Sequence, residues 1–100
     1  MENCPCCQKE KKTPREEEFI KNLKARLNRI SGQLTGVSNM VGENRYCSDI
    51  LIQIAAIESA LKEVGFLILK DHLKTCVADD IKQDNLESLE EAIEISKKLL

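Results

Sequence analysis

The stretch that decides the fold is RYCSDILIQIAAIESALKEVGFLILKDHLKTCVADDI, residues 45–81. Apolar residues recur along it at helical spacing, and it contains no proline that would break a helix. It therefore predicts one helix from near Arg45 to about Ile81, roughly 55 Å long at 1.5 Å per residue. A helix of this length is longer than a domain of 100 residues is wide, so the chain cannot cover its apolar surface alone. A partner helix is expected.

Three side chains that bind soft metals lie on one face of this predicted helix. At about 100° per residue, Cys47, His72 and Cys76 all fall on one apolar seam. The other residues of the apolar seam are Ile50, Leu51, Ile54, Leu61, Gly65, Ile68 and Leu69. Cys47 and His72 are roughly 37 Å apart along the helix, too far to share a ligand within one chain. Two copies packed antiparallel along the seam would bring Cys47 of one chain beside His72 and Cys76 of the other, at two equivalent sites.

Two thiolates and one imidazole make a soft ligand set. Zn²⁺ prefers four ligands and would need a further residue or a water molecule, whereas Cu(I) prefers soft sulfur ligands. The set therefore favours Cu(I). The alternative is that both cysteines are buried structural residues and that the histidine is an ordinary residue of the seam, as each of the three would suggest if taken alone.

The flanking sequences predict two more helices. Thr13 and Pro14 are typical of a helix start. Apolar residues follow at helical spacing as far as Gly42, which fits a helix end. A shorter third helix is expected after Asp84, which would cap it, with Glu87 three residues later. The predicted fold is all-α, with three helices per chain.

The composition fits a small helical protein of the cytoplasm. The chain is 42% hydrophobic, with three aromatic residues and no Trp, which argues against a β-sandwich or barrel. No apolar run approaches the ~18 residues of a membrane span, and the polar N-terminus shows no secretion signal. Residues 1–12 predict a flexible tail and residues 13–100 one domain. The tail holds Cys4, Cys6 and Cys7, and the C-x-x-C spacing of the first and last is a weak metal-binding signal.

The charges are distributed unevenly along the chain. Residues 19–36 carry four cations and no acid, whereas residues 77–100 carry seven acids against three lysines. Arg26, Arg29 and Gln33 lie within about 60° of one another on the first helix, beside its apolar stripe. Lys21 and Lys24 of the same helix would add to this positive charge, and the name basic stripe is used for all five residues, whichever side of the helix they occupy. Arginine binds phosphate and guanine with paired hydrogen bonds, so the stripe indicates a DNA-binding face, with an ordinary solvated face as the alternative.

Three motifs carry a resemblance to a known family. RLNRISGQLTGV at 26–37, ENRYCSDILIQIAAI at 43–57 and DHLKTCVADDIK at 71–82 resemble the CsoR/RcnR/FrmR family of small helical bacterial repressors. The resemblance covers about residues 15–99. It implies three helices per chain, an antiparallel dimer built around a four-helix bundle, a dimer of dimers, and binding to operator DNA without a helix-turn-helix element.

Members of this family differ at the ligand positions. The resemblance implies a copper sensor of the CsoR type, because such sensors carry Cys, His and Cys where this chain has Cys47, His72 and Cys76. It further implies that Tyr46 and a glutamate of the third helix, Glu91 in preference to Glu90, act beside the ligands. Nickel and cobalt members have a histidine in place of the last cysteine. Formaldehyde sensors have a proline at residue 2, where this chain has Glu2.

The function expected from the sequence is that of a Cu(I)-responsive repressor and not of an enzyme. The metal-free homotetramer would bind operator DNA and would release it when Cu(I) binds between chains. The closest alternative is a persulfide-responsive repressor that uses Cys47 and Cys76. A less favoured alternative is a copper buffer or chaperone that uses the cysteines of the tail, and a copper donor protein would be a further partner. A thiol enzyme is least favoured, since no substrate pocket or oxyanion device is visible in the sequence.

Overall fold

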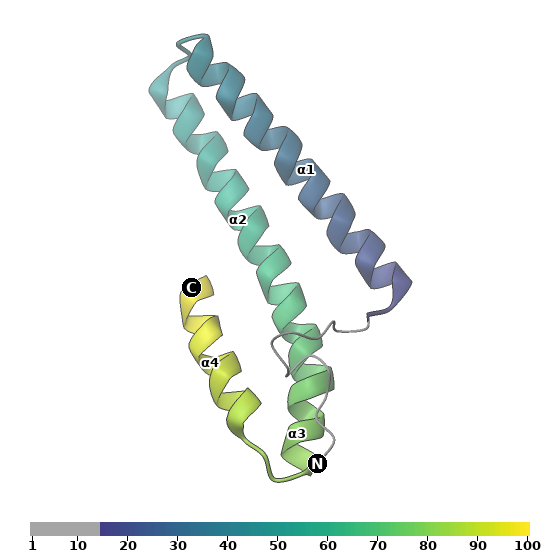
Figure 1. Cartoon of the computed structure of the whole chain (residues 1–100). Helices are drawn as coiled ribbons and strands as arrows, with labels where there is room; N and C mark the ends of the chain where they lie inside the picture. Colours follow the sequence, from purple (N-terminus) through teal and green to yellow (C-terminus); the bar gives the residue numbers. More distant parts are fainter. Residues whose placement is uncertain (1–14) are drawn as a thin grey trace. The chain divides into compact units, whose positions relative to one another are not determined.

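The structure is a computed structural model that describes residues 15–100, and its regular elements are all helical over that range. Helix α1 spans Glu17–Gly42 and helix α2 spans Cys47–His72 (Figure 1). A π-helical turn, η2, covers Leu73–Val77, and it is followed by α3 at Ala78–Lys82 and α4 at Glu87–Leu99. The predicted all-α class with three helices is confirmed if α2, η2 and α3 are counted as one helical stretch.

The described residues divide into two compact units. One consists of residues 17–64, and the other consists of residues 65–100 together with residues 15 and 16. The predicted tail and the residues Thr13 and Pro14 lie outside the described residues, but helix α1 begins only at Glu17, so the helix start predicted at Pro14 is too early by about three residues. No helix within residues 15–100 is both long enough and apolar enough to cross a membrane.

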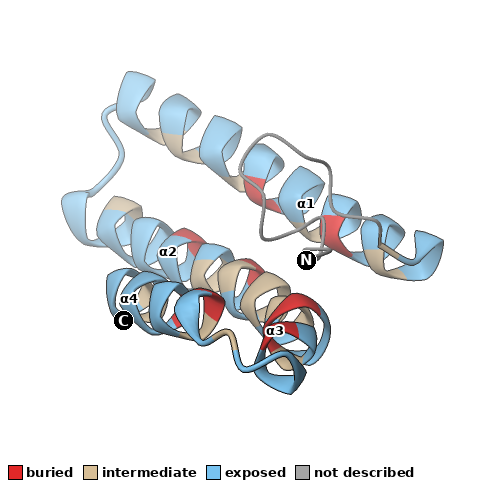
Figure 2. Cartoon of the chain, turned by 60° about the horizontal axis from the view of Figure 1, so that its bottom comes forward, coloured by how far each residue is buried: buried red, intermediate tan, exposed pale blue. Residues whose placement is uncertain are grey.

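The unit of residues 17–64 is a helical hairpin of α1 and the first part of α2 (Figure 1). Helix α1 ends at Gly42 as predicted, and the turn reverses the chain at Asn44, whose φ of 56° lies in the left-handed region. Only four of its apolar side chains are buried; they are Leu23, Ile30, Ile57 and Val64. Figure 2 shows these buried positions as short segments between long exposed ones. The hairpin therefore leaves much of its apolar surface uncovered.

The long central helix is continuous from 47 to 82 but changes register near its end. The sequence predicts a regular α-helix here, whereas the structure has the π-turn η2 at Leu73–Val77. The Thr75 hydroxyl donates to the Asp71 carbonyl oxygen at 2.9 Å. A threonine hydroxyl that bonds back to this carbonyl competes with the regular backbone hydrogen bond. Thr35 makes the same kind of bond to the Ser31 carbonyl oxygen in α1, which stays regular, so this bond alone does not produce the π-turn. Such π-turns are frequent at functional sites.

The unit of residues 65–100 has a small core formed by α4 against η2 and α3. Its most buried side chains are Cys76 and Val77 of η2, Asp80 of α3 and Ala92 of α4. The predicted cap at Asp84 is wrong. Asp84 has a φ of 59° in the turn after α3, and Asn85 Oδ1 accepts the Glu87 backbone N–H at 3.1 Å. The N-cap position of α4 is Leu86, which has no side-chain cap, so the Asn85 side chain bonds to the first helical N–H from one residue before the cap.

Candidate functional site

Cys47 is the first residue of α2, and its side chain is exposed and free. The residue before it, Tyr46, sets the start of the helix, because its carbonyl oxygen accepts the N–H groups of Asp49 at 3.1 Å and Ile50 at 3.2 Å. The Tyr46 side chain is 71% exposed. The thiol and the phenol that the sequence places side by side therefore both stand at the surface of the chain.

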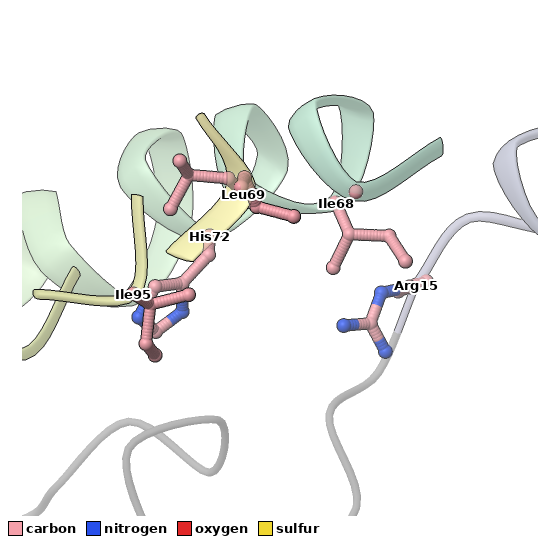
Figure 3. Close-up of a pocket in the computed structure, with 7 residues that line it drawn as sticks. Arg15, Ile68, Leu69, His72 and Ile95 are labelled. Atoms are coloured by element: carbon pink, nitrogen blue, oxygen red, sulfur yellow. The ribbon is translucent and has the colours of Figure 1, made fainter. Parts of the chain in front are cut away.

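His72 is the last residue of α2 and is half-buried. It lines a mainly apolar cavity of about 200 Å³ in the unit of residues 65–100. The other lining residues are Arg15, Gly65, Ile68, Leu69, Ile95 and Leu99. Figure 3 shows the His72 ring next to Ile95, with Arg15 on the opposite side of the cavity. Arg15 Nε is 3.8 Å from Asp71 Oδ2, so the residue before His72 holds a cation at the same cavity.

Cys76 lies in the π-turn η2, and its side chain is 0% exposed. Its sulfur is 3.8 Å from Thr75 Oγ1. Cys76 is disulfide-bonded in this structure. Cysteine binds metals as its thiolate, so a ligand role for Cys76 requires the reduced residue.

The structure brings some of the predicted ligands into one unit and leaves one apart. His72 and Cys76 belong to the unit of residues 65–100, whereas Cys47 begins α2 in the unit of residues 17–64. Within residues 15–100, no three His, Cys, Asp or Glu side chains gather as a metal site. Glu90 and Glu91 are both exposed on α4. The predicted ligand set is therefore not assembled within residues 15–100 of one chain.

The basic stripe divides into exposed and half-buried members. Lys21, Lys24 and Arg29 are exposed, whereas Arg26 and Gln33 are half-buried. The enclosed Gln33 Oε1 has no hydrogen-bond partner among the described residues.

Arg26 is the member of the stripe with a partner across the hairpin. Its Nη1 donates to Glu63 Oε1 of α2 at 2.9 Å, and its Nε donates to Asn22 Oδ1 at 2.8 Å. The sequence analysis did not single out Glu63. The available signal was the antiparallel hairpin itself, because both residues lie 16 positions from the turn, one before Gly42 and one after Cys47.

Most of the chain matches one protein family. The family model described as "Metal-sensitive transcriptional repressor" matches residues 20–98. The chain belongs to this family. The resemblance seen in the sequence is thereby confirmed, and since the family consists of transcriptional repressors, so is the prediction that the chain is not an enzyme.

Individual members of the family are similar over most of the chain. The copper-sensing transcriptional repressor CsoR of Bacillus subtilis is 44% identical over 88 residues, which cover 87% of this chain and 84% of that protein. The crystal structure of the copper-sensing repressor CsoR with Cu(I) from Geobacillus thermodenitrificans superposes with a TM-score of 0.78 at 46% identity, covering 87% of this chain and 92% of that one. The nickel-responsive regulator InrS gives 0.70 at 40% identity, covering 86% and 98%. The same fold thus serves members that respond to different metals.

Proposed function

We propose that this chain is a copper(I)-responsive transcriptional repressor that binds operator DNA in its metal-free form and releases it on binding Cu(I). The observation that carries the proposal is its 46% identity, over 87% of the chain, to a copper-sensing repressor whose crystal structure was determined with Cu(I). Cys47, His72 and Cys76 would supply the two sulfur atoms and one nitrogen atom of a soft site. A coupling free energy of about 1–3 kcal/mol between metal and DNA binding is typical of such switches.

The proposed site lies between two chains of an antiparallel homodimer. Cys47 begins α2 and His72 ends it, so one chain cannot bring both to the same ion. Leu51, Ile54 and Leu61 of the apolar seam are 63%, 44% and 51% exposed, which is costly for large aliphatic side chains that recur on one helix. Their burial against a second copy is worth roughly 25 cal/mol per Å² of apolar surface. We propose that two such dimers form a tetramer.

Residues beside the ligands would transmit the metal signal. Tyr46 precedes Cys47, and Glu91 lies on α4, the helix that packs on the π-turn of Cys76. We propose that both hydrogen-bond to the liganded site, with Glu90 as the alternative to Glu91, because groups next to metal ligands orient them. Residues 13–100 would form the sensing and DNA-binding domain, and residues 1–12 a separate tail.

The basic stripe is the proposed DNA contact. Lys21, Lys24 and Arg29 are exposed on one helix and are available to phosphates, and a tetramer would repeat them four times. Arg26 and Gln33 complete the stripe at its half-buried edge. We expect phosphate contacts to supply most of the affinity, as is usual for protein–DNA complexes.

The test is a titration of a DNA duplex that the reduced wild-type protein selects from a random-sequence pool. Fluorescence anisotropy would follow binding without oxygen, first alone, then with Cu(I), then with polysulfide. Release by Cu(I) and not by polysulfide supports the proposal. Release by polysulfide alone identifies the sulfur-responsive alternative that uses Cys47 and Cys76. Failure to enrich any sequence would overturn the repressor function itself.

A further inference from the structure

We propose that Glu63 restrains Arg26 and thereby lowers the affinity of the chain for operator DNA. This inference rests on the proposed function, because it concerns a member of the basic stripe. Arg26 Nη1 is 2.9 Å from Glu63 Oε1, within both hydrogen-bond and ion-pair distance. The guanidinium Nε donates to Asn22 Oδ1 at 2.8 Å. Two of the five guanidinium N–H groups are therefore already in use within the chain.

The pair is built into the helical hairpin. Arg26 lies 16 residues before the end of α1, and Glu63 lies 16 residues after the start of α2, so an antiparallel hairpin brings them to the same level. Arg26 shares its side of α1 with the buried residues Leu23 and Ile30, whereas Lys21 and Lys24 lie on the opposite side. The side chains of Arg26 and Glu63 are 35% and 61% exposed. A phosphate can therefore reach the pair.

Electrostatics give the sign of the effect. The paired guanidinium and carboxylate have no net charge, so a phosphate that approaches Arg26 must displace Glu63 or accept a negative charge next to its own. Either outcome makes the Arg26 contact weaker than that of an unpaired arginine. Exposed ion pairs contribute modestly, which corresponds to roughly a 1.4- to 5-fold effect on affinity for each engaged copy of Arg26. Several engaged copies would multiply this factor.

The matched control lies on the same helix. Glu58 forms an ion pair with Lys62 at 3.6 Å, between two residues of α2 one turn apart. Glu58→Gln and Glu63→Gln remove the same charge from exposed positions of one helix. A general increase in net positive charge would strengthen DNA binding equally in both variants, whereas release of Arg26 would strengthen it only in Glu63→Gln.

The experiment measures binding of the metal-free variants to the duplex selected by the wild-type protein, at several salt concentrations. We expect Glu63→Gln to bind at least about 1.4-fold more tightly than Glu58→Gln and to show a steeper dependence of log affinity on log salt, since an additional phosphate is contacted. In an Arg26→Ala background, Glu63→Gln should bring no gain beyond that of Glu58→Gln.

Other results would contradict the proposed role of Glu63 or the proposed function. Equal affinities for the two glutamine variants, or a gain from Glu63→Gln that persists in the Arg26→Ala background, would overturn the inference while leaving the repressor function intact. Weaker binding by Glu63→Gln, with circular dichroism and unfolding midpoint unchanged, would overturn it as well, since Glu63 would then support the DNA contact. If the wild-type protein selects no duplex, the proposed function fails, which this comparison keeps separate from the role of Glu63.

Discussion

Leu99, the last residue of α4, closes directly over Gly65 of α2. A Cβ atom built at position 65 would lie 2.8 Å from Leu99 Cδ2, closer than such atoms pack, and 3.4 Å from Leu99 Cδ1, an ordinary contact distance. The absence of a side chain at Gly65 therefore lets the end of α4 settle on α2, at the wall of the cavity that His72 also lines. Gly65 and Leu99 thus contact each other at the wall of this cavity.

The effect of Gly65→Ala on stability should depend on which residue stands at position 99. In the wild-type background we expect it to be neutral or destabilising, because Leu99 must shift. In a Leu99→Ala background we expect stabilisation by up to about 1 kcal/mol, because alanine favours the helix over glycine and no longer meets Leu99. Urea unfolding monitored by circular dichroism measures both. A gain of similar size in the two backgrounds would show that the close contact costs nothing.

Cu(I) binding should depend on residues from two chains. Cys47→Ala and His72→Ala should each lose the site with two sulfur ligands and one nitrogen ligand, because each removes one of three ligands. Mixing the two variants and allowing subunits to exchange should restore one intact site per heterodimer. X-ray absorption and competition with a Cu(I) chelator measure this recovery.

The control for this mixture is Cys47→Ala alone, taken through the same exchange procedure, which should remain without the site. Either single variant that binds Cu(I) as tightly as the wild type, with the same ligands, would place the metal elsewhere.

A chain that lacks residues 1–12 should still respond to copper. The proposed ligands all lie at or after Cys47, so the truncated chain should bind the selected duplex and release it with Cu(I). Its total Cu(I) capacity should fall if the tail cysteines also bind the metal. Anisotropy and metal stoichiometry measured on the same sample distinguish the two roles. Retained DNA binding with no release by Cu(I) would instead assign sensing to the tail.

The parts of the structure that the sequence predicted follow from patterns that one helix carries by itself. Apolar spacing and the absence of proline predict the helical stretch through Cys47 and Cys76, and Gly42 predicts the end of α1. The sequence did not predict the π-turn. The α-helical and π-helical registers are similar, and the pattern of residues does not show that Thr75 will bond back to Asp71. The cap expected at Asp84 is absent because the left-handed φ of Asp84 places it in the turn, and the N-cap position of α4 is Leu86, which has no side-chain cap.

The sequence did not predict the contacts of the site that join two different helices. The apolar stripe of α1 suggested that Arg26 stands beside it, free for DNA, but the partner at Glu63 is 37 residues away in the sequence. Finding it requires the register of the hairpin, which the turn at Asn44 determines. The proposed ligand set also depends on more than one helix, because Cys47 begins α2 and His72 ends it, and the proposal brings them together only by adding a second chain.

The last prediction concerns Arg29, the exposed arginine of the basic stripe. Arg29→Ala should weaken operator binding without lowering stability, because the side chain is exposed on α1. If Arg29 contacts one phosphate, the slope of log affinity against log salt should flatten by about 0.9, and by more if several copies contact the duplex. Arg26→Ala should cost less affinity than Arg29→Ala, since Glu63 already neutralises Arg26. Lys98→Ala is the control, because it removes the same charge from an exposed position of α4.

Fluorescence anisotropy across a salt series measures all three variants, and Cu(I) affinity in the absence of DNA should be unchanged in each. An Arg29→Ala variant whose affinity and slope equal those of Lys98→Ala would return the basic stripe to an ordinary solvated surface.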